Sequence, residues 1–162
     1  MLTSHALAYV GLGSNLDDPL NRVERACQSI AGIEGLEIVQ ISPWYESKAI
    51  GPGEQPDFIN GVAAVKTQLE PLQLLKALQA IEDEQGRQRL VRWGARTLDL
   101  DLLIYGDTVM DCAQLTLPHP HLHQRNFVVY PLADVAPQLV LPSGESIASL
   151  RQQLGTEGLR RL

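Results

Sequence analysis

The segment Leu-Asp-Leu-Asp-Leu at residues 98–102 constrains the fold of this chain more than any other part of its sequence. A period of two is that of a β-strand, whose successive side chains point to opposite faces. We therefore expect the three leucines, with Ile104 farther along, to face a hydrophobic core. Asp99 and Asp101 then share the other face, roughly 6.5–7 Å apart along the strand.

Two neighbouring carboxylates repel each other, so their charge must be compensated or solvated. One explanation is a metal site, because Mg²⁺ takes one or two carboxylates and completes its shell with water and substrate phosphates. Two such ions can lie about 3.5–4 Å apart across a phosphoryl-transfer centre. The other explanation is the solvent-exposed face of a strand, which an isolated Asp-x-Asp does not exclude.

The arginines next to this pair favour a polyphosphate site. Four of the ten arginines lie within residues 87–96, a segment without an acidic residue: Arg87, Arg89, Arg92 and Arg96. Guanidinium groups bind phosphate oxygens and neutralise transferred charge. The chain as a whole is acidic, with a formal net charge of −6 and a pI near 5.1. It is therefore not expected to bind nucleic acid or an anionic membrane with its whole surface.

Apolar periodicity and turn residues divide the chain into a β-α-β-β-α-β order. Strands are expected at about residues 7–12, 36–46, 58–68 and 98–105, and helices are expected to begin at Pro19 and Pro71 and to end near Gly32 and Gly86. The first helix is expected to be capped by Asp18 and to bury a stripe of Leu20, Val23, Cys27 and Ile30. In the second strand Val39, Ile41 and Tyr45 are expected on one face. The order predicts an α+β, ferredoxin-like sandwich, an antiparallel sheet with helices packed on it.

The rest of the chain is a C-terminal extension with turns, an apolar stretch at residues 127–135 and an amphipathic helix near 146–154. Periodicity leaves open whether this extension covers the sheet or lengthens it. The length suits one domain over residues 1–162. With two cysteines, no basic leader and no apolar run long enough for a bilayer, we expect a cytoplasmic protein without a membrane partner.

Several common catalytic and nucleotide-binding motifs are absent. The sequence has neither the G-x-x-x-x-G-K-[ST] of a P-loop nor the G-x-S-x-G of a nucleophile elbow. Gly11-Leu12-Gly13 follows a strand without a third glycine, so we interpret it as a tight turn at the strand end.

A few polar residues outside the acidic pair are candidates for ligand contacts. Gln79 and Glu82 adjoin the apolar stripe of the second helix, either as surface residues or as contacts to a ligand at the helix end. A phosphate contact by His119 is plausible, whereas His121 and His123 are expected in solvent. No matching third ligand supports zinc.

Residues 92–103, Arg-Trp-Gly-Ala-Arg-Thr-Leu-Asp-Leu-Asp-Leu-Leu, resemble the signature of the 6-hydroxymethyl-7,8-dihydropterin pyrophosphokinases of folate biosynthesis. The resemblance continues in order along nearly the whole chain, at residues 13–16, 51–52, 55–60, 82 with 86–87, 118–119 and 125–127. The family has a ferredoxin-like α+β fold. It transfers diphosphate from ATP to the hydroxymethyl group of the pterin and releases AMP.

The resemblance implies roles for individual residues. Asp99 and Asp101 would bind two Mg²⁺ ions and, with Arg87 and Arg96, carry catalysis. The residues around ATP would be Gln79, Arg87, Arg89, Arg96, Thr116, His119 and Arg125. The pterin would lie among Ser47, Ile50, Phe58, Asn60, Trp93 and Phe127, with stacked rings and an amide at its edge. The enzyme is expected to act as a monomer on ATP and the pterin.

The chain departs from the family pattern at a few positions. Ala95 stands where proline is frequent, Ser47-Lys48 where many members have Thr-Pro, and Pro120 where a tyrosine is common. The arginine-rich segment is also one residue shorter than the family pattern.

The expected reaction is in-line attack of the hydroxymethyl oxygen on the β-phosphorus, and no side chain stands out as a general base. Two other functions are weighed against it. One is a different Mg²⁺-dependent phosphotransferase or hydrolase with the same aspartate pair. The other is an RNA-binding module, which would need a basic sheet face and stacked aromatics in RNP motifs; no RNP pattern is visible.

Overall fold

A computed structural model describes residues 5–15, 18–48, 57–85 and 98–162. Its main sheet is antiparallel, with the strand order β5-β1-β4-β3-β8 and with β2 also paired to β4. These strands are β1 (Ala6–Ser14), β2 (Leu36–Ile41), β3 (Tyr45–Ser47), β4 (Phe58–Thr67), β5 (Asp99–Tyr105) and β8 (Leu159–Arg161). A separate hairpin consists of β6 (Met110–Asp111) and β7 (Thr116–Leu117).

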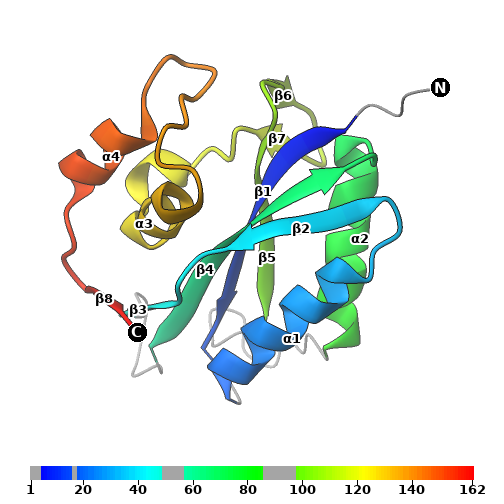
Figure 1. Cartoon of the computed structure of the whole chain (residues 1–162), viewed down its shortest axis with the longest axis horizontal. Helices are drawn as coiled ribbons and strands as arrows, with labels where there is room; N and C mark the ends of the chain where they lie inside the picture. Colours follow the sequence, from blue (N-terminus) through cyan, green and yellow to red (C-terminus); the bar gives the residue numbers. More distant parts are fainter. Residues whose placement is uncertain (1–4, 16–17, 49–56, 86–97) are drawn as a thin grey trace.

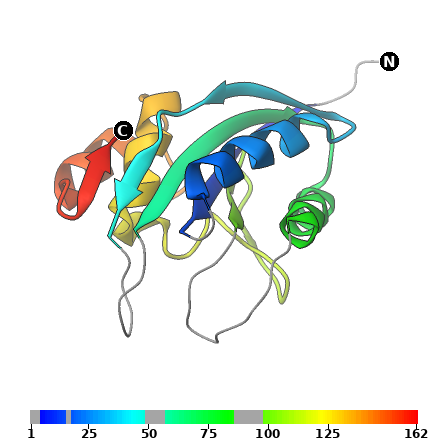
Figure 2. The same cartoon turned by 90° about the horizontal axis from the view of Figure 1, so that it is seen from below.

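The first half of the chain forms the ferredoxin-like unit that the element order predicts. Helices α1 (Pro19–Ala31) and α2 (Pro71–Glu84) pack on one face of the sheet (Figures 1 and 2). Their buried side chains, among them Val23, Ile30, Leu74 and Leu78, form one hydrophobic core with inward residues of the strands. Pro71 begins α2, where Glu70 and Gln73 make a reciprocal capping box.

The C-terminal extension both covers and lengthens the sheet. Helices α3 (Asn126–Val135) and α4 (Ile147–Leu154) bury Val129, Leu132 and Ile147 in a second core, against Tyr9 and Val62 of the other sheet face. The last strand, β8, then pairs with β3 at the end of the sheet where α3 and α4 also lie (Figure 1). The described sheet is therefore sandwiched between two pairs of helices.

A bulge in β5 corrects the expectation that Ile104 shares a face with the leucines. Tyr9 pairs with Ile104 but Val10 pairs with Leu102, so Leu103 is an extra residue in β5. The alternation shifts by one after it. Leu100 and Leu102 pack with α1 and α2, whereas Leu103 and Ile104 join the core under α3.

The expected strand at 36–46 is instead two strands. Ser42 interrupts it, because its Oγ accepts the backbone N–H of Val62 at 2.9 Å in place of a regular strand pair. Val39 is an extra residue opposite β4, and Val39 and Ile41 are 51% and 41% exposed, whereas Tyr45 is buried. Tyr45 therefore does not share a face with Val39 and Ile41, contrary to the expectation that all three lie on one face.

Two details of α1 also differ from expectation. Asp18 occupies the cap position in the left-handed conformation (φ 59°), and its side chain makes no capping hydrogen bond. Leu20 is 38% exposed, and Ala26 completes the buried stripe in its place. Within the described residues, no helix is long and apolar enough to cross a membrane.

Candidate active site

Asp99 and Asp101 lie on one face of β5, as the alternation predicts, and both are half-buried. Strand β5 is at the end of the main sheet, with β1 as its only partner there among the described strands. Directly across from the two aspartates, β1 places Gly13 opposite Asp99 and Gly11 opposite Asp101. The acidic pair thus borders a strip of backbone without side chains.

The two glycines are not the tight turn that the sequence suggested. Both lie inside β1, which continues to Ser14, and neither has a positive φ. A Cβ on Gly13 would lie 2.9 Å from Oδ1 of Asn60, and one on Gly11 would lie 3.4 Å from the side chain of Leu103. Gly13 is needed because the side chain of Asn60 occupies the space above it, a reason that only the folded sheet reveals, whereas a Cβ on Gly11 would make an ordinary van der Waals contact.

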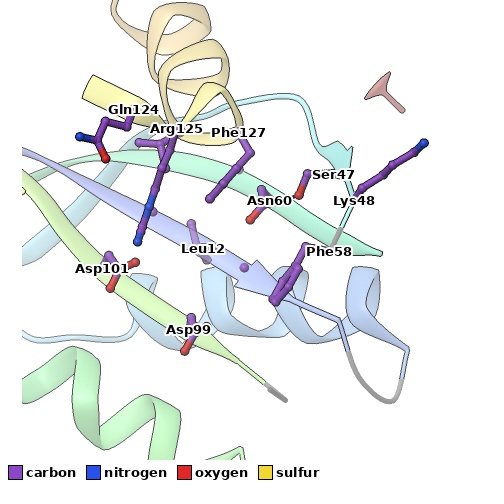
Figure 3. Close-up of a pocket in the computed structure, with 14 residues that line it drawn as sticks. Leu12, Ser47, Lys48, Phe58, Asn60, Asp99, Asp101, Gln124, Arg125 and Phe127 are labelled. Carbon is purple, nitrogen blue, oxygen red and sulfur yellow. Dashed lines mark hydrogen bonds between the residues drawn. The ribbon is translucent and has the colours of Figure 1, made fainter. Parts of the chain in front are cut away.

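A cavity of about 410 Å³ opens above this strip, on the face that α3 partly covers (Figure 3). Such a volume is that of a small-molecule site. Its walls come from β1, β3, β4, β5 and the start of α3, and its lining residues are Gly11, Leu12, Gly13, Ser47, Lys48, Phe58, Asn60, Gly61, Asp99, Asp101, Gln124, Arg125, Phe127 and Val128. Four of the six residues that the resemblance assigns to the pterin are among them: Ser47, Phe58, Asn60 and Phe127.

Asn60 and Ser47 form the polar part of this cavity. The Nδ2 of Asn60 donates a hydrogen bond to Oγ of Ser47 over 2.7 Å, and both residues are more than 90% buried. Because the bond uses one amide hydrogen, it fixes the amide plane. Oδ1 then points over Gly13, so the amide is oriented before any ligand enters.

Arg125 and two aromatic rings complete the cavity. Phe58 comes from the start of β4 and Phe127 from the first turn of α3, and both point into the cavity (Figure 3). The guanidinium carbon of Arg125 lies 5.8 Å from the ring centroid of Phe127, within range of a cation–π contact. The side chain of Arg125 extends from there toward β5 (Figure 3). A positive group is thereby placed on the same cavity as the two carboxylates.

A second cavity, of about 260 Å³, lies between α2, β5 and the β6–β7 hairpin. Its lining residues are Leu75, Leu100, Asp101, Leu102, Cys112, Ala113, Gln114, Leu115, Thr116, His119 and Pro120. The leucines make one part of it apolar, and Thr116 and His119 make another part polar. Asp101 lines both cavities, so the two spaces meet at a carboxylate.

His119 presents a defined tautomer to the second cavity. The backbone N–H of His121 donates to its Nδ1 over 3.2 Å, so the neutral ring carries its proton on Nε2. Burial lowers the pKa of His119, and Arg125 and His121 lower it further, against an opposing effect of Asp101. The ring is therefore a neutral donor through Nε2. His121 is exposed as expected, but His123 is only partly so, with Nε2 3.4 Å from Glu145.

Glu82 has a role that neither sequence interpretation anticipated. It is only 6% exposed, and its carboxylate accepts the backbone N–H of Leu100 at 2.9 Å. Leu100 lies between the two aspartates, so Glu82 ties α2 to the open edge of β5 at the acidic pair. Gln79, one turn earlier, is exposed and lines neither cavity.

Several predicted site residues lie outside the described residues: Ile50, Arg87, Arg89, Trp93 and Arg96. Conversely, Lys48, Gln124 and the two glycines line the larger cavity although no ligand role was predicted for them. Lys48 and Gln124 carry no periodic or spacing signal in the sequence. They line the same cavity only because α3 folds back over β3 and β4.

The acidic pair offers two oxygen donors of the kind that Mg²⁺ takes in proteins. In the described part of the chain, no group of three or more histidine, cysteine, aspartate or glutamate side chains could hold a metal ion. Mg²⁺ needs only one or two carboxylates when phosphates and water supply its other ligands. Asp99 and Asp101, both oxygen donors that face a cavity, would hold it.

A ferredoxin-like sheet with two cavities that meet at a carboxylate has the layout of an enzyme that binds two small molecules side by side. A model of the 7,8-dihydro-6-hydroxymethylpterin-pyrophosphokinase (HPPK) family matches residues 9–137. The chain belongs to this family, whose members are pyrophosphokinases that act on hydroxymethyldihydropterin in folate biosynthesis.

Similar proteins from several bacteria support the assignment. The chain is 49% identical over 154 residues to the 2-amino-4-hydroxy-6-hydroxymethyldihydropteridine pyrophosphokinase of Pseudomonas aeruginosa, which covers 95% of each protein. It is 45% identical over 155 residues to the enzyme of the same name from Haemophilus influenzae, covering 96% of this chain and 97% of that protein.

Solved structures confirm the fold. A crystal structure of Plasmodium falciparum HPPK-DHPS with pterin and p-hydroxybenzoate matches with a TM-score of 0.74 at 14% identity, over 99% of this chain and 47% of that one. A structure of HPPK-DHPS in complex with substrates matches with a TM-score of 0.73 at 12% identity, over 97% of this chain and 48% of that one. The chain thus spans about half the length of these structures.

Proposed function

We propose that this protein transfers the diphosphate group of ATP to the hydroxymethyl oxygen of 6-hydroxymethyl-7,8-dihydropterin in a Mg²⁺-dependent reaction that releases AMP. The observation that carries the proposal is that Asp101 lines both cavities. Two substrates bound in separate cavities would then meet at the acidic pair.

The pterin occupies the larger cavity. A flat bicyclic ring suits the faces of Phe58 and Phe127, and the fixed amide of Asn60 can read the hydrogen-bonding edge of the ring. Ser47 orients that amide, so the serine replaces the hydroxyl that threonine provides in many family members. Ile50 and Trp93 complete this site by resemblance to the family.

ATP occupies the smaller cavity. The apolar part, with Leu75 and Leu102, suits the adenine ring, and Thr116 and the Nε2–H of His119 suit phosphate oxygens. Arg125 approaches the phosphates from the side of the larger cavity. By resemblance, Gln79, Arg87, Arg89 and Arg96 also bind ATP, and Arg87 and Arg96 neutralise the charge that moves during transfer.

The reaction itself requires mainly positioning. The hydroxymethyl oxygen attacks the β-phosphorus in line and loses its proton to solvent, the new O–P bond forms, and the bond between the β-phosphorus and the bridging oxygen of AMP breaks. When bound at Asp99 and Asp101, Mg²⁺ would lower the pKa of the alcohol and neutralise the bridging oxygens. His119 is not a base in this scheme, because its Nδ1 is already an acceptor within the protein.

The same proposal includes the oligomeric state, the cellular compartment and the partners of the enzyme. Residues 1–162 act as one domain, and the protein acts as a cytoplasmic monomer with no nucleic-acid or membrane partner. Its acidic net charge of −6 supports the lack of a polyanionic partner.

Product analysis tests the proposal. The purified protein is incubated with ATP, MgCl₂ and 6-hydroxymethyl-7,8-dihydropterin, and nucleotides and pterins are separated chromatographically. Equal amounts of AMP and pterin diphosphate are expected, with neither product when the pterin or Mg²⁺ is omitted. Formation of ADP would instead assign a monophosphate transfer, and ATP breakdown without the pterin would assign a hydrolase.

A further inference from the structure

Asn126 stands at the first residue of α3, between two residues of the larger cavity. Arg125 and Phe127 line that cavity, but Asn126 does not. Its side chain instead contacts the end of the chain: Nδ2 donates to the carbonyl oxygen of Gly155 at 3.2 Å and to that of Glu157 at 3.0 Å. Both amide hydrogens are therefore used to hold one segment.

That segment, residues 155–162, here called the C-terminal strap, is also bonded to the opposite wall of the cavity. Its strand β8 pairs with β3 so that Leu159 lies opposite Ser47. The carbonyl oxygen of Gly158 accepts the N–H of Lys48 at 3.1 Å, and the N–H of Leu162 donates to the carbonyl oxygen of Trp44 at 2.9 Å. The C-terminal strap thus connects the start of α3 to β3.

Strand β3 depends on this support. It has three residues and pairs with β4 on one side, and within the described part of the chain its partner on the other side is the C-terminal strap. Without β8 of the strap, β3 would be a three-residue strand at the edge of the sheet, and such a strand is weakly held by its own pairing. Its last residue, Ser47, accepts the hydrogen bond that fixes the Asn60 amide. A displacement of β3 would therefore move Ser47 and disturb its hydrogen bond to the Asn60 amide.

Two glycines with positive φ allow the C-terminal strap to follow this path. Gly155 has φ 65° and ψ −175°, and Gly158 has φ 72°. The first of these conformations is essentially restricted to glycine. Gly155 lets the chain leave α4 with its carbonyl oxygen directed at Asn126, and the turn at Gly158 then brings β8 beside β3.

We propose that Asn126 is a positioning residue for the pterin: its amide holds the C-terminal strap against α3, and the strap holds Ser47 and Lys48 at the wall of the larger cavity. The inference rests on the proposed binding of the pterin in that cavity. The smaller cavity has no lining residue in β3, in the strap or at the start of α3. Since Arg125 is the one residue beside Asn126 that is proposed to reach ATP, the role should appear mainly in pterin binding.

Asn126→Asp tests the role of the two amide hydrogens, because it keeps the size of the side chain and replaces both donors by acceptors. Steady-state kinetics of the full-length protein should show a KM for the pterin raised about tenfold. The KM for ATP should stay within about twofold, and kcat should change less than the KM for the pterin. Asn126→Ala should give the same pattern.

Gly155→Ala perturbs the same contact from the other side. The added Cβ has free space but strains the backbone at φ 65°, so a selective rise in the KM for the pterin is again expected. Since both changes break one contact, the double variant Asn126→Ala/Gly155→Ala should be no worse than the more defective single variant.

Ser146→Ala is the matched control. Ser146 caps α4 through a 3.1 Å bond from Ser149, so its loss removes a hydrogen bond in the same region without touching the strap. It should lower the Tm but leave both KM values unchanged. An unchanged pterin KM in Asn126→Asp, an equal rise for both substrates, or a selective rise in Ser146→Ala would overturn the inference. If wild-type protein forms no AMP, the proposed function fails instead.

Discussion

At the scale of single residues, Asp101 stands out because it lines both cavities. It faces the larger cavity across from Gly11 and also lines the smaller one, so each substrate of the proposed reaction would contact it or its bound metal. Asp99 lines only the larger cavity. The two carboxylates, equivalent in the sequence pattern, are thus not equivalent in space.

Asp101→Asn should abolish most of the turnover while leaving the fold intact. The amide keeps the shape but loses the charge that holds Mg²⁺, so a fall in kcat of roughly 10²–10³-fold or more is expected. The measurement is AMP formation, with circular dichroism as the check on folding. Asp107→Asn, an exposed aspartate just after β5, is the control and should keep full activity. Retained turnover in Asp101→Asn would contradict the metal role.

Gly13→Ala should impair pterin binding. The new Cβ would lie 2.9 Å from Oδ1 of Asn60, which is too close, so the amide must move. We expect the KM for the pterin to rise about tenfold, the equivalent of about 1.4 kcal/mol, with little change in the KM for ATP. Gly32→Ala, at the end of α1 with φ −84°, is the control. Equal effects of the two substitutions on the KM for the pterin would show that the close approach of Gly13 to Asn60 does not affect pterin binding.

At the scale of elements, a side-chain hydrogen bond joins β3 to α3. The hydroxyl of Tyr45, on β3, donates a hydrogen bond to the carboxylate of Asp134, on α3. Burial raises the pKa of Tyr45 to about 12, and the bond to Asp134 raises it in the same direction. The folded state therefore favours the neutral phenol.

This contact predicts a loss of stability at high pH. Because the folded pKa of Tyr45 is above the ordinary value of 10, the stabilisation is complete below pH 10 and is lost as the pH rises toward 12. Thermal unfolding of the wild type should show a falling Tm across this window. Tyr45→Phe should start from a lower Tm at pH 8 and show a smaller further decrease. Parallel pH profiles of the two proteins would rule out the contribution of Tyr45.

At the scale of the whole molecule, the sheet is shared by two cores. Leu78 of α2 is fully buried in the core on one face of the sheet, and Leu132 of α3 is fully buried in the core on the other face. Strands β1 and β4 contribute side chains to both cores, because their successive residues face opposite sides. If one core unfolds, the strands that it shares with the other core are disrupted as well, so we expect both cores to unfold together.

Leu78→Ala and Leu132→Ala should each cost about 2–5 kcal/mol of unfolding free energy. Since the cores share the sheet, both variants should still unfold in one transition, with the same midpoint by circular dichroism and by tryptophan fluorescence. Val109→Ala, at a residue 73% exposed, is the control and should change stability by less than about 0.5 kcal/mol. Two separate transitions would show that the helix layers fold independently.

Much of this molecule follows from the sequence alone. The period of two at residues 98–102 determines that Asp99 and Asp101 share a face, and the order of the apolar segments determines the β-α-β-β-α-β unit, because both depend on local periodicity. The family motifs also pointed to residues that the fold gathers around the larger cavity. These are patterns that a chain carries before it folds.

Only the tertiary structure decided the rest. It put Gly11 and Gly13 under a cavity instead of in a turn, buried Glu82 against β5, and shifted Ile104 to the other core through the bulge at Leu103. It also brought the C-terminal strap into contact with both Asn126 and β3. The physical reason is common to all four: each depends on which atoms of a distant segment lie across from a residue. Strand register and helix packing set those neighbours, and neither leaves a period in the sequence.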